Sequence, residues 1–259
     1  MTESEWQEPV TGFQFSPEQV VVTEALQNEK LKNCGLDGQA LKGHVDISFY
    51  IAIGIHVGIN NGISAEGNVN MLTGLIQHRP VRLGEPLIAR GAITNVVDVP
   101  RGQTVETDVW FEDESGERVV SAPRKSLRPD PHKSAERGAG ERPEAVIKDV
   151  SQLTSFESYT LTPELVKAYS SEGNSIHYEM ESANKAGFRA PIIGGGMGVH
   201  YLINTLWQQR EVMSFDLDIY FRRPIFWDDV FSVAGSPWKS IGLLREGKVL
   251  TEARINKIE

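Results

Sequence analysis

The chain has 259 residues, of which 40% are hydrophobic and 24% charged, an ordinary globular balance with room for two modest domains or one large one. The net charge of −9 and the isoelectric point near 5.3 argue against a general nucleic-acid binder, which needs a basic face. The single cysteine, Cys34, excludes an intrachain disulfide and gives no cysteine-based metal site.

The first residues, from Met1 to Trp6, are acidic and contain no apolar signal core. The longest nearly apolar run, from Ile47 to Ile59, is too short to cross a bilayer. We therefore expect a soluble cytoplasmic protein that does not enter a membrane.

The first half begins with a predicted helix at about Ile47–Asn61, within which we expect His56 to be a core residue. Stretches of strand-forming residues follow, with a hairpin turn at 113–116 between the last two. They predict strands at Leu72–Gln77, Pro86–Val99, Thr104–Glu112 and Arg118–Leu127.

The composition changes sharply at Asp130–Glu144, which is polar and rich in proline and glycine. Such a stretch buries too little apolar surface to fold by itself. We interpret it as a linker between two domains, at 1–129 and 145–259, which is either mobile or draped over the surface.

The second half opens with a predicted strand at Phe156–Leu161, and Thr162 and Pro163 then provide the cap and first residue of a helix. A longer helix is predicted at Gly196–Gln208. Three further strands are predicted, at Phe215–Phe221, Val230–Ala234 and Leu243–Ile255.

The two halves share an order of elements, a helix followed by strand hairpins. Each also contains a strand closed by an Arg-Pro turn, at Arg79-Pro80 and at Arg223-Pro224. This degenerate repeat predicts an antiparallel sheet wrapped on one central helix in each half.

The segment from Tyr169 to Met197 carries the chemistry. Glu172, Asn174 and His177 bring a carboxylate, an amide and an imidazole together, and a carboxylate with a histidine can move protons. The glycine triplet that ends in Gly196 then opens the long helix, whose first backbone N–H groups can stabilise an oxyanion.

This segment resembles the signature of the MaoC-like, R-specific enoyl-CoA hydratases. Glu172 stands where that family has its catalytic Asp, Gly195 where it often has His, and Ser175 where it usually has Pro. The residues that fit in order and spacing are Asn174, Ile176, His177, Ala183, Gly187, Phe188, Gly196 and Met197. The resemblance implies an α+β fold of two fused hotdog domains, each a curved antiparallel sheet wrapped around a central helix.

The resemblance also implies roles for single residues. Glu172 and His177 would hold the water that adds to a 2-enoyl thioester, and Asn174 would support the loop around the carboxylate. The Gly196 N–H would bind the thioester oxygen. Gly195, in place of the family's His, would either widen the pocket or mark lost catalysis.

Arg222 and Arg223 follow an alternating strand, where they would bind the phosphates of CoA or of a carrier protein. We therefore expect a hydratase or dehydratase of acyl thioesters that requires neither a metal nor a redox cofactor, with a homodimer as a further expectation. A thioesterase or natural-product cyclase on the same fold, and a non-catalytic acyl-thioester binding subunit, stay open as alternatives.

Overall fold

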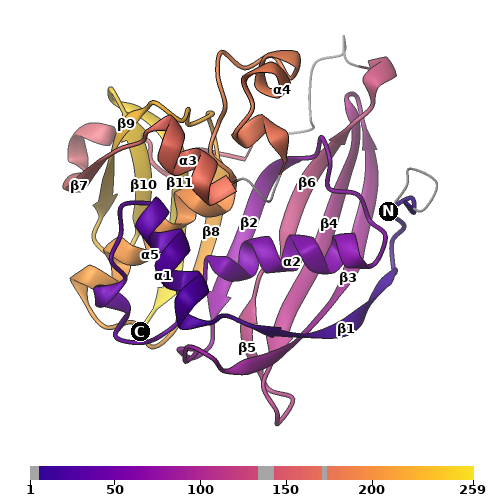
Figure 1. The fold of residues 1–259 in the computed structure, drawn as a ribbon, viewed down its shortest axis with the longest axis horizontal. Coiled ribbons are helices and arrows are strands. Elements are labelled where there is room, and N and C mark those ends of the chain that lie inside the picture. Colours follow the sequence, from indigo (N-terminus) through magenta and orange to yellow (C-terminus); the bar gives the residue numbers. More distant parts are fainter. Residues whose placement is uncertain (1–5, 134–142, 171–173) are drawn as a thin grey trace.

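A computed structural model describes residues 6–133, 143–170 and 174–259. The strands among them form one 11-stranded antiparallel sheet in the order β1-β3-β4-β5-β2-β8-β11-β10-β9-β7, with β6 paired to β2 and β4 (Figure 1). The strands are β1 Gln14–Val21, β2 Val69–Gln77, β3 Pro86–Val99, β4 Gly102–Glu112, β5 Arg118–Ser121, β6 Arg124–Pro129, β7 Thr154–Thr160, β8 Phe215–Phe221, β9 Val230–Ser236, β10 Ser240–Arg245 and β11 Lys248–Ile258. The α-helices are α1 Glu24–Asn33, α2 Phe49–Asn60, α3 Pro163–Ser170, α4 Met180–Lys185 and α5 Gly195–Gln209, and short 3-10 turns lie at Gln39–Leu41, Pro131–Lys133, Val150–Gln152 and Ser175–His177.

The sheet has two parts that join edge to edge. Strands β1 to β6 lie on one side and β7 to β11 on the other, and the join is the antiparallel pair β2–β8, which runs from Leu72 opposite Tyr220 to Gln77 opposite Phe215. Helix α2 lies against the first part and α5 against the second (Figure 1). This arrangement confirms the predicted α+β fold of two hotdog units.

The two central helices differ in burial. Every residue of α5 from Met197 to Trp207 is buried, so this helix is the core of its half. Helix α2 buries Phe49–Ile51 and Val57–Gly58 but exposes Ala52, His56 and Asn60. The prediction that His56 is a core residue is therefore wrong; its Nδ1 lies 3.0 Å from the Ala52 carbonyl on the exposed side.

Two predicted strands are each divided in the structure. The stretch Leu243–Ile255 forms the hairpin β10–β11, because Glu246 and Gly247 both have positive φ, of 50° and 73°, as a tight primed turn requires. The stretch Arg118–Leu127 breaks at Pro123, which has no N–H to donate to a strand partner; β5 ends before it and β6 begins after it.

Strand β1 and helices α1 and α4 have no counterpart in the sequence prediction. Strand β1 contains Pro17 and a register shift between Phe15 and Glu18, and it pairs only with β3 at the edge of the sheet, where a proline is tolerated. Helix α1 follows directly, with the Thr23 hydroxyl accepting a hydrogen bond from Leu26 N as its N-cap.

The predicted linker is attached to the sheet at both ends. Asp130 N donates to the Arg101 carbonyl, and the carbonyls of Pro143 and Glu144 accept hydrogen bonds from Arg222. Its middle, residues 134–142, lies outside the described residues, so its mobility stays a prediction.

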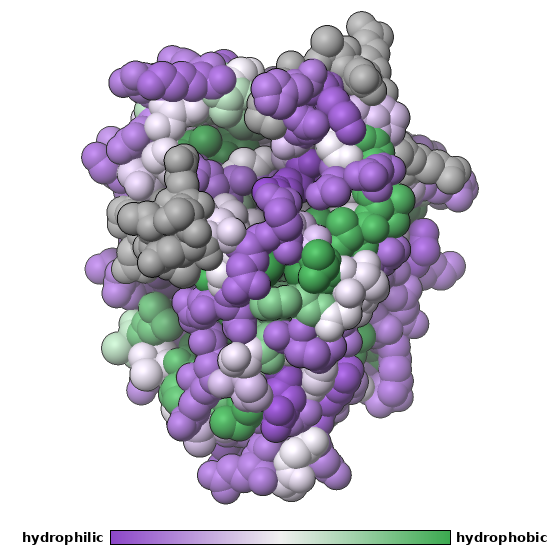
Figure 2. Space-filling model, turned by 90° about the vertical axis from the view of Figure 1, so that its right-hand side faces the viewer, coloured by the Kyte–Doolittle hydropathy of each residue, from purple (hydrophilic) through white to green (hydrophobic). Residues whose placement is uncertain are grey.

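The surface on the side of β1 and β3 is mixed in character. Figure 2 shows hydrophobic residues grouped near the middle of this face, with hydrophilic residues around and between them.

Candidate active site

The signature segment is held in place by short local hydrogen bonds. Asn174 caps the 3-10 turn: its Oδ1 accepts from Ile176 N at 3.2 Å, and its carbonyl accepts from His177 N at 3.0 Å. Ile192 N then donates to the Ile176 carbonyl, which ties this turn to the strand-like stretch before α5. Asn174 thus supports the loop, the role that a short amide side chain suits.

His177 is oriented by the same stretch. Its Nδ1 lies 2.7 Å from the Ile192 carbonyl, which can only accept, so Nδ1 carries the proton and Nε2 has the free lone pair. A Cβ added to Gly194 would lie 3.7 Å from this Nε2, so the free nitrogen faces the start of α5. Burial lowers the pKa of His177, opposed by its hydrogen bond to Ile192, and this favours the neutral, proton-accepting form.

The N-terminus of α5 offers backbone donors at the same place. Gly194 is the N-cap and has no capping side chain, and the first N–H groups of any α-helix lack partners within it. A Cβ added to Gly196 would meet no atom within 4 Å, so the backbone there borders open space. A ligand oxygen can therefore approach the Gly196 N–H closely.

Gly195 has a different reason to be glycine. A Cβ at this position would lie 2.8 Å from Phe221 Cε1, closer than a side chain tolerates. The Phe221 ring from β8 thus leaves no room for a Cβ, and glycine is needed here for packing. Whether Gly195 also widens the pocket, or marks lost catalysis, stays a prediction.

The turn after α4 explains two more signature residues. Phe188 N donates to the Ala183 carbonyl and Gly187 N to the Asn184 carbonyl, while Gly187 has a φ of +83°. These are the paired hydrogen bonds of a Schellman motif, which favours glycine at the left-handed position. Both Gly187 and the fully buried Ala183 therefore serve the fold of this segment.

The predicted carboxylate, Glu172, lies outside the described residues, between α3 and the turn that carries His177. Its approach to His177 stays a prediction.

The two arginines predicted to bind phosphate differ. Arg222 donates from Nε to Glu252 Oε1 at 2.6 Å, and both of its terminal nitrogens donate to the carbonyls of Pro143 and Glu144. Arg222 thereby anchors the chain that follows the linker. Arg223 is exposed and donates from Nη1 to the Val249 carbonyl at 2.6 Å, which leaves its other nitrogens available. A phosphate contact is the better prediction for Arg223.

A buried polar network connects the two halves close to this site. His200 lies one helical turn after Gly196, and its Nδ1 is 2.8 Å from Asp46 Oδ2 and 2.6 Å from Ser48 Oγ. Its Nε2 is 2.9 Å from the hydroxyl of Tyr169. Asp46 and His200 are 0% and 1% exposed, so their hydrogen bonds come from this network and not from solvent.

Sequence reasoning missed this network because its members are far apart in the chain. Asp46 and His200 are separated by 154 residues, and neither stands in a recognisable motif. The available signal was the helical spacing that places His200 on the same face as Gly196.

The described residues contain no group of three or more His, Cys, Asp or Glu arranged to hold a metal ion. In the same part of the chain, no helix combines the length and apolar character needed to span a membrane.

No family model matches the chain, and no curated protein matches its sequence. Solved structures match it over nearly its whole length. HtdX from Mycobacterium tuberculosis has a TM-score of 0.73 at 16% identity, covering 92% of this chain and 97% of that one. A MaoC-like dehydratase from Phytophthora capsici has a TM-score of 0.70 at 15% identity, covering 96% and 97%. An acyl-ACP thioesterase from Bacteroides thetaiotaomicron has a TM-score of 0.60 at 10% identity, covering 95% and 98%.

These likenesses show the fold. The chain has the double-hotdog architecture of MaoC-like dehydratases, as the signature segment predicts.

Proposed function

We propose that the protein is a hydratase or dehydratase of 2-enoyl or 3-hydroxyacyl thioesters. One observation carries the proposal: the unprotonated Nε2 of His177 faces the start of α5, where the Gly196 backbone borders open space. A base and an oxyanion donor at one place are what water addition to an activated double bond requires.

The proposed reaction adds one water without any other reactant. A base takes a proton from water while the water oxygen bonds to the β-carbon, and the π electrons move to give an enolate. The enolate oxygen accepts a hydrogen bond from the Gly196 N–H, and a proton then returns to the α-carbon. This chemistry needs no metal or redox cofactor, because the N–H donors stabilise the charge that a metal could otherwise stabilise.

Glu172 completes the proposed pair with His177. We expect Glu172→Gln to lose activity by about 10²- to 10⁴-fold, because it keeps the size but removes the base. Glu172→Asp should keep activity or raise it, because it has the shorter carboxylate of the hydratase signature. Glu164→Gln, a carboxylate in the first turn of α3, is the matched control. Full activity of Glu172→Gln would show that His177 or another group is the base.

The direct test follows loss of the enoyl absorbance of crotonyl-CoA and of longer 2-enoyl-CoA thioesters. The proposal expects hydration at one or more chain lengths. If neither the native protein nor Glu172→Asp hydrates any of them, the hydratase proposal fails.

A thioesterase is the second candidate, because the acyl-ACP thioesterase fold matches 95% of the chain. It predicts release of free thiol from a saturated acyl thioester. A non-catalytic binding subunit predicts thermal stabilisation by the thioester with neither hydration nor thiol release. The same assays, run with the CoA thioester and with the carrier-protein thioester, decide which of the two presents the acyl group. We expect Arg223→Ala to raise KM for the thioester whose phosphates Arg223 contacts.

A further inference from the structure

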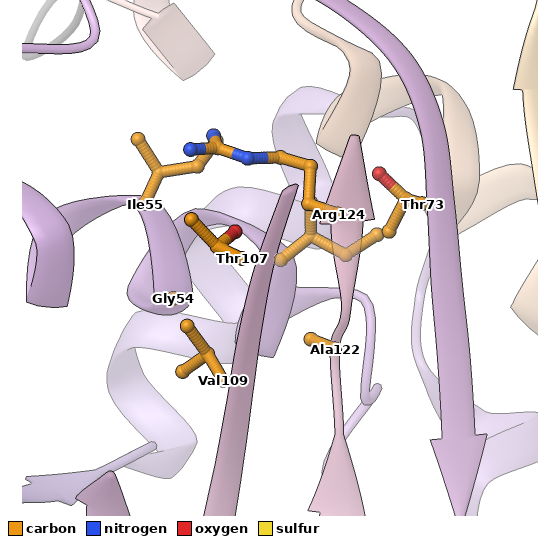
Figure 3. A pocket seen from close by; sticks show the side chains of 8 residues that line it. Gly54, Ile55, Thr73, Thr107, Val109, Ala122 and Arg124 are labelled. Atoms are coloured by element: carbon orange, nitrogen blue, oxygen red, sulfur yellow. The ribbon is translucent and has the colours of Figure 1, made fainter. Parts of the chain in front are cut away.

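The sheet of the first half carries a polar row where its core should be. Arg124 on β6 pairs with Thr73 on one neighbouring strand and with Thr107 on the other. All three line a pocket together with Ile51 and Ile55 of α2, so their side chains are on the face that the helix covers. Figure 3 shows the Arg124 side chain extending between the sheet and the helix, with its guanidinium group next to Ile55.

Several arginines of the described chain are not exposed, and Arg124 differs from the others in its charge pairing. Arg79, Arg128, Arg222 and Arg245 each form an ion pair with a carboxylate. Arg124 forms no ion pair or hydrogen bond with its side chain among the described residues.

An unpaired guanidinium in this half-buried position is destabilising, because the pocket removes part of its hydration without supplying a carboxylate. Burial lowers the pKa of Arg124 to about 10, so the group still carries its charge at neutral pH. The hydroxyl of Thr73 accepts a hydrogen bond from Asn70 Nδ2 at 2.9 Å, and the Oδ1 of the same amide is buried without a partner among the described residues. The residues that line the pocket include a positive charge and no carboxylate.

The cavity at this point is small, with a volume of ≈ 10 Å³, room for roughly one water molecule. A carboxylate matches the two-pronged geometry of a guanidinium. It is larger than one water, so its entry requires the α2 side chains that line the cavity to move. A tetrahedral phosphate is bulkier and requires a larger movement. The charge of the pocket thus favours an anion, and a carboxylate needs the smaller adjustment.

The sheet register gives the distance between this pocket and the candidate active site. Thr73 lies opposite Arg124 on one side and opposite Ile219 on the other, and Phe221, two residues along β8, packs against Gly195 at the start of α5. From the spacing of strands and of residues along them, the Arg124 backbone is roughly 12 Å from that of Phe221, on the same face of the sheet. An acyl chain held at the start of α5 can span such a distance.

We propose that Arg124 is a specificity residue that binds a carboxylate at the far end of the acyl chain, so that the preferred substrate is the thioester of a dicarboxylic acid. This inference rests on the proposed function, since it takes the start of α5 as the thioester site.

The test compares two medium-chain 2-enoyl-CoA thioesters of equal length, one ending in a methyl group and one in a carboxylate. For the native protein we expect kcat/KM to be higher for the carboxylate form. Arg124→Met should lose about 10- to 100-fold in kcat/KM for that form and keep or improve its value for the methyl form. Arg124→Lys, which keeps the charge without the planar fork, should fall between them, and exposed Arg101→Met is the matched control.

Binding separates a failure of this inference from a failure of the proposed function. Calorimetry with the saturated analogues, which cannot be hydrated, should show tighter binding of the carboxylate form to the native protein than to Arg124→Met, even if neither enoyl form turns over. Arg124→Met should have a melting temperature equal to or above that of the native protein, which shows that it folds.

Equal preference for the two chain ends in the native protein, or an unchanged preference in Arg124→Met, would mean that Arg124 holds only a water. Stabilisation of the native protein by inorganic phosphate as strong as that by the dicarboxylic thioester would reveal a general anion site. Either outcome overturns the proposal.

Discussion

Helices α5 and α2 occupy equivalent places in the two halves, yet they differ in burial and in the sheet residues that they cover. The sheet residues of β8 that face α5, such as Leu217 and Ile219, are apolar and fully buried, and α5 itself is buried along most of its length. The sheet under α2 instead presents Thr73, Thr107 and Arg124, and the helix leaves a cavity beside them. The comparison teaches that two units of the same architecture can pack differently, with an apolar core around the helix in one and a small polar cavity beside the helix in the other.

The histidines of the two halves give the largest expected contrast. His177→Ala should reduce hydration by about 10²- to 10⁴-fold, because it removes the free Nε2 that faces the start of α5. His56→Ala, on the exposed side of α2, should leave the rate unchanged. Hydration rates of both variants are measured at saturating and at limiting enoyl-CoA, and circular dichroism verifies that each variant is folded. Equal losses of rate in the two variants would contradict the assignment of the active site to the second half.

The network between the halves should be the largest contributor to stability among the groups discussed. Asp46→Ala leaves the N–H of Ser48 buried without its acceptor and removes the charged one of the two partners of His200 Nδ1, so we expect a loss of about 3 kcal/mol in the free energy of unfolding. Asp98→Ala, an exposed carboxylate on β3, should change it by less than about 0.5 kcal/mol. Urea denaturation of both variants measures the difference, and a loss no greater than that of Asp98→Ala would mean that the network does not join the halves energetically.

The acid side of the pH profile reports on His177. Because burial lowers its pKa in the folded protein, the neutral form persists below the ordinary value of about 6.5. The stability linked to this residue is complete above pH of about 6.5 and is lost as the pH falls through the lowered pKa. We expect kcat/KM to stay constant below that pH before it declines. We also expect the difference in unfolding free energy between the native protein and His177→Gln to shrink at acid pH. A decline of kcat/KM that begins above pH of about 6.5 is the contrary result.

Glycines in the two helices should respond oppositely to alanine. A Cβ on Gly54 would lie 3.5 Å from Val109, an ordinary contact, so Gly54→Ala should stabilise the protein by about 0.5 to 1 kcal/mol through helix propensity. Gly195→Ala would collide with the Phe221 ring and should destabilise it. Thermal denaturation of the pair tests this prediction, and stabilisation by Gly195→Ala would show that the start of α5 has spare room.

Much of this molecule follows from local sequence. The helices at 49–60 and 195–209 and the strand at Phe215–Phe221 were predictable because their apolar patterns match the periods of helix and strand. The signature also predicted a loop at His177 and the start of a helix at Gly196, and the structure has a 3-10 turn and the first turn of α5 at these places.

Other features depend on partners that a local pattern cannot show. The edge position of β1 makes Pro17 acceptable in a strand, and Phe221 gives Gly195 its reason to be glycine. Asp46 meets His200 only through the contact between the halves. Arg124 could be read as an ordinary strand residue; its isolation between Thr73 and Thr107 exists because the sheet brings those strands together and turns all three side chains toward α2. Periodicity is a property of neighbouring residues, whereas burial and charge pairing depend on what the rest of the chain places opposite them.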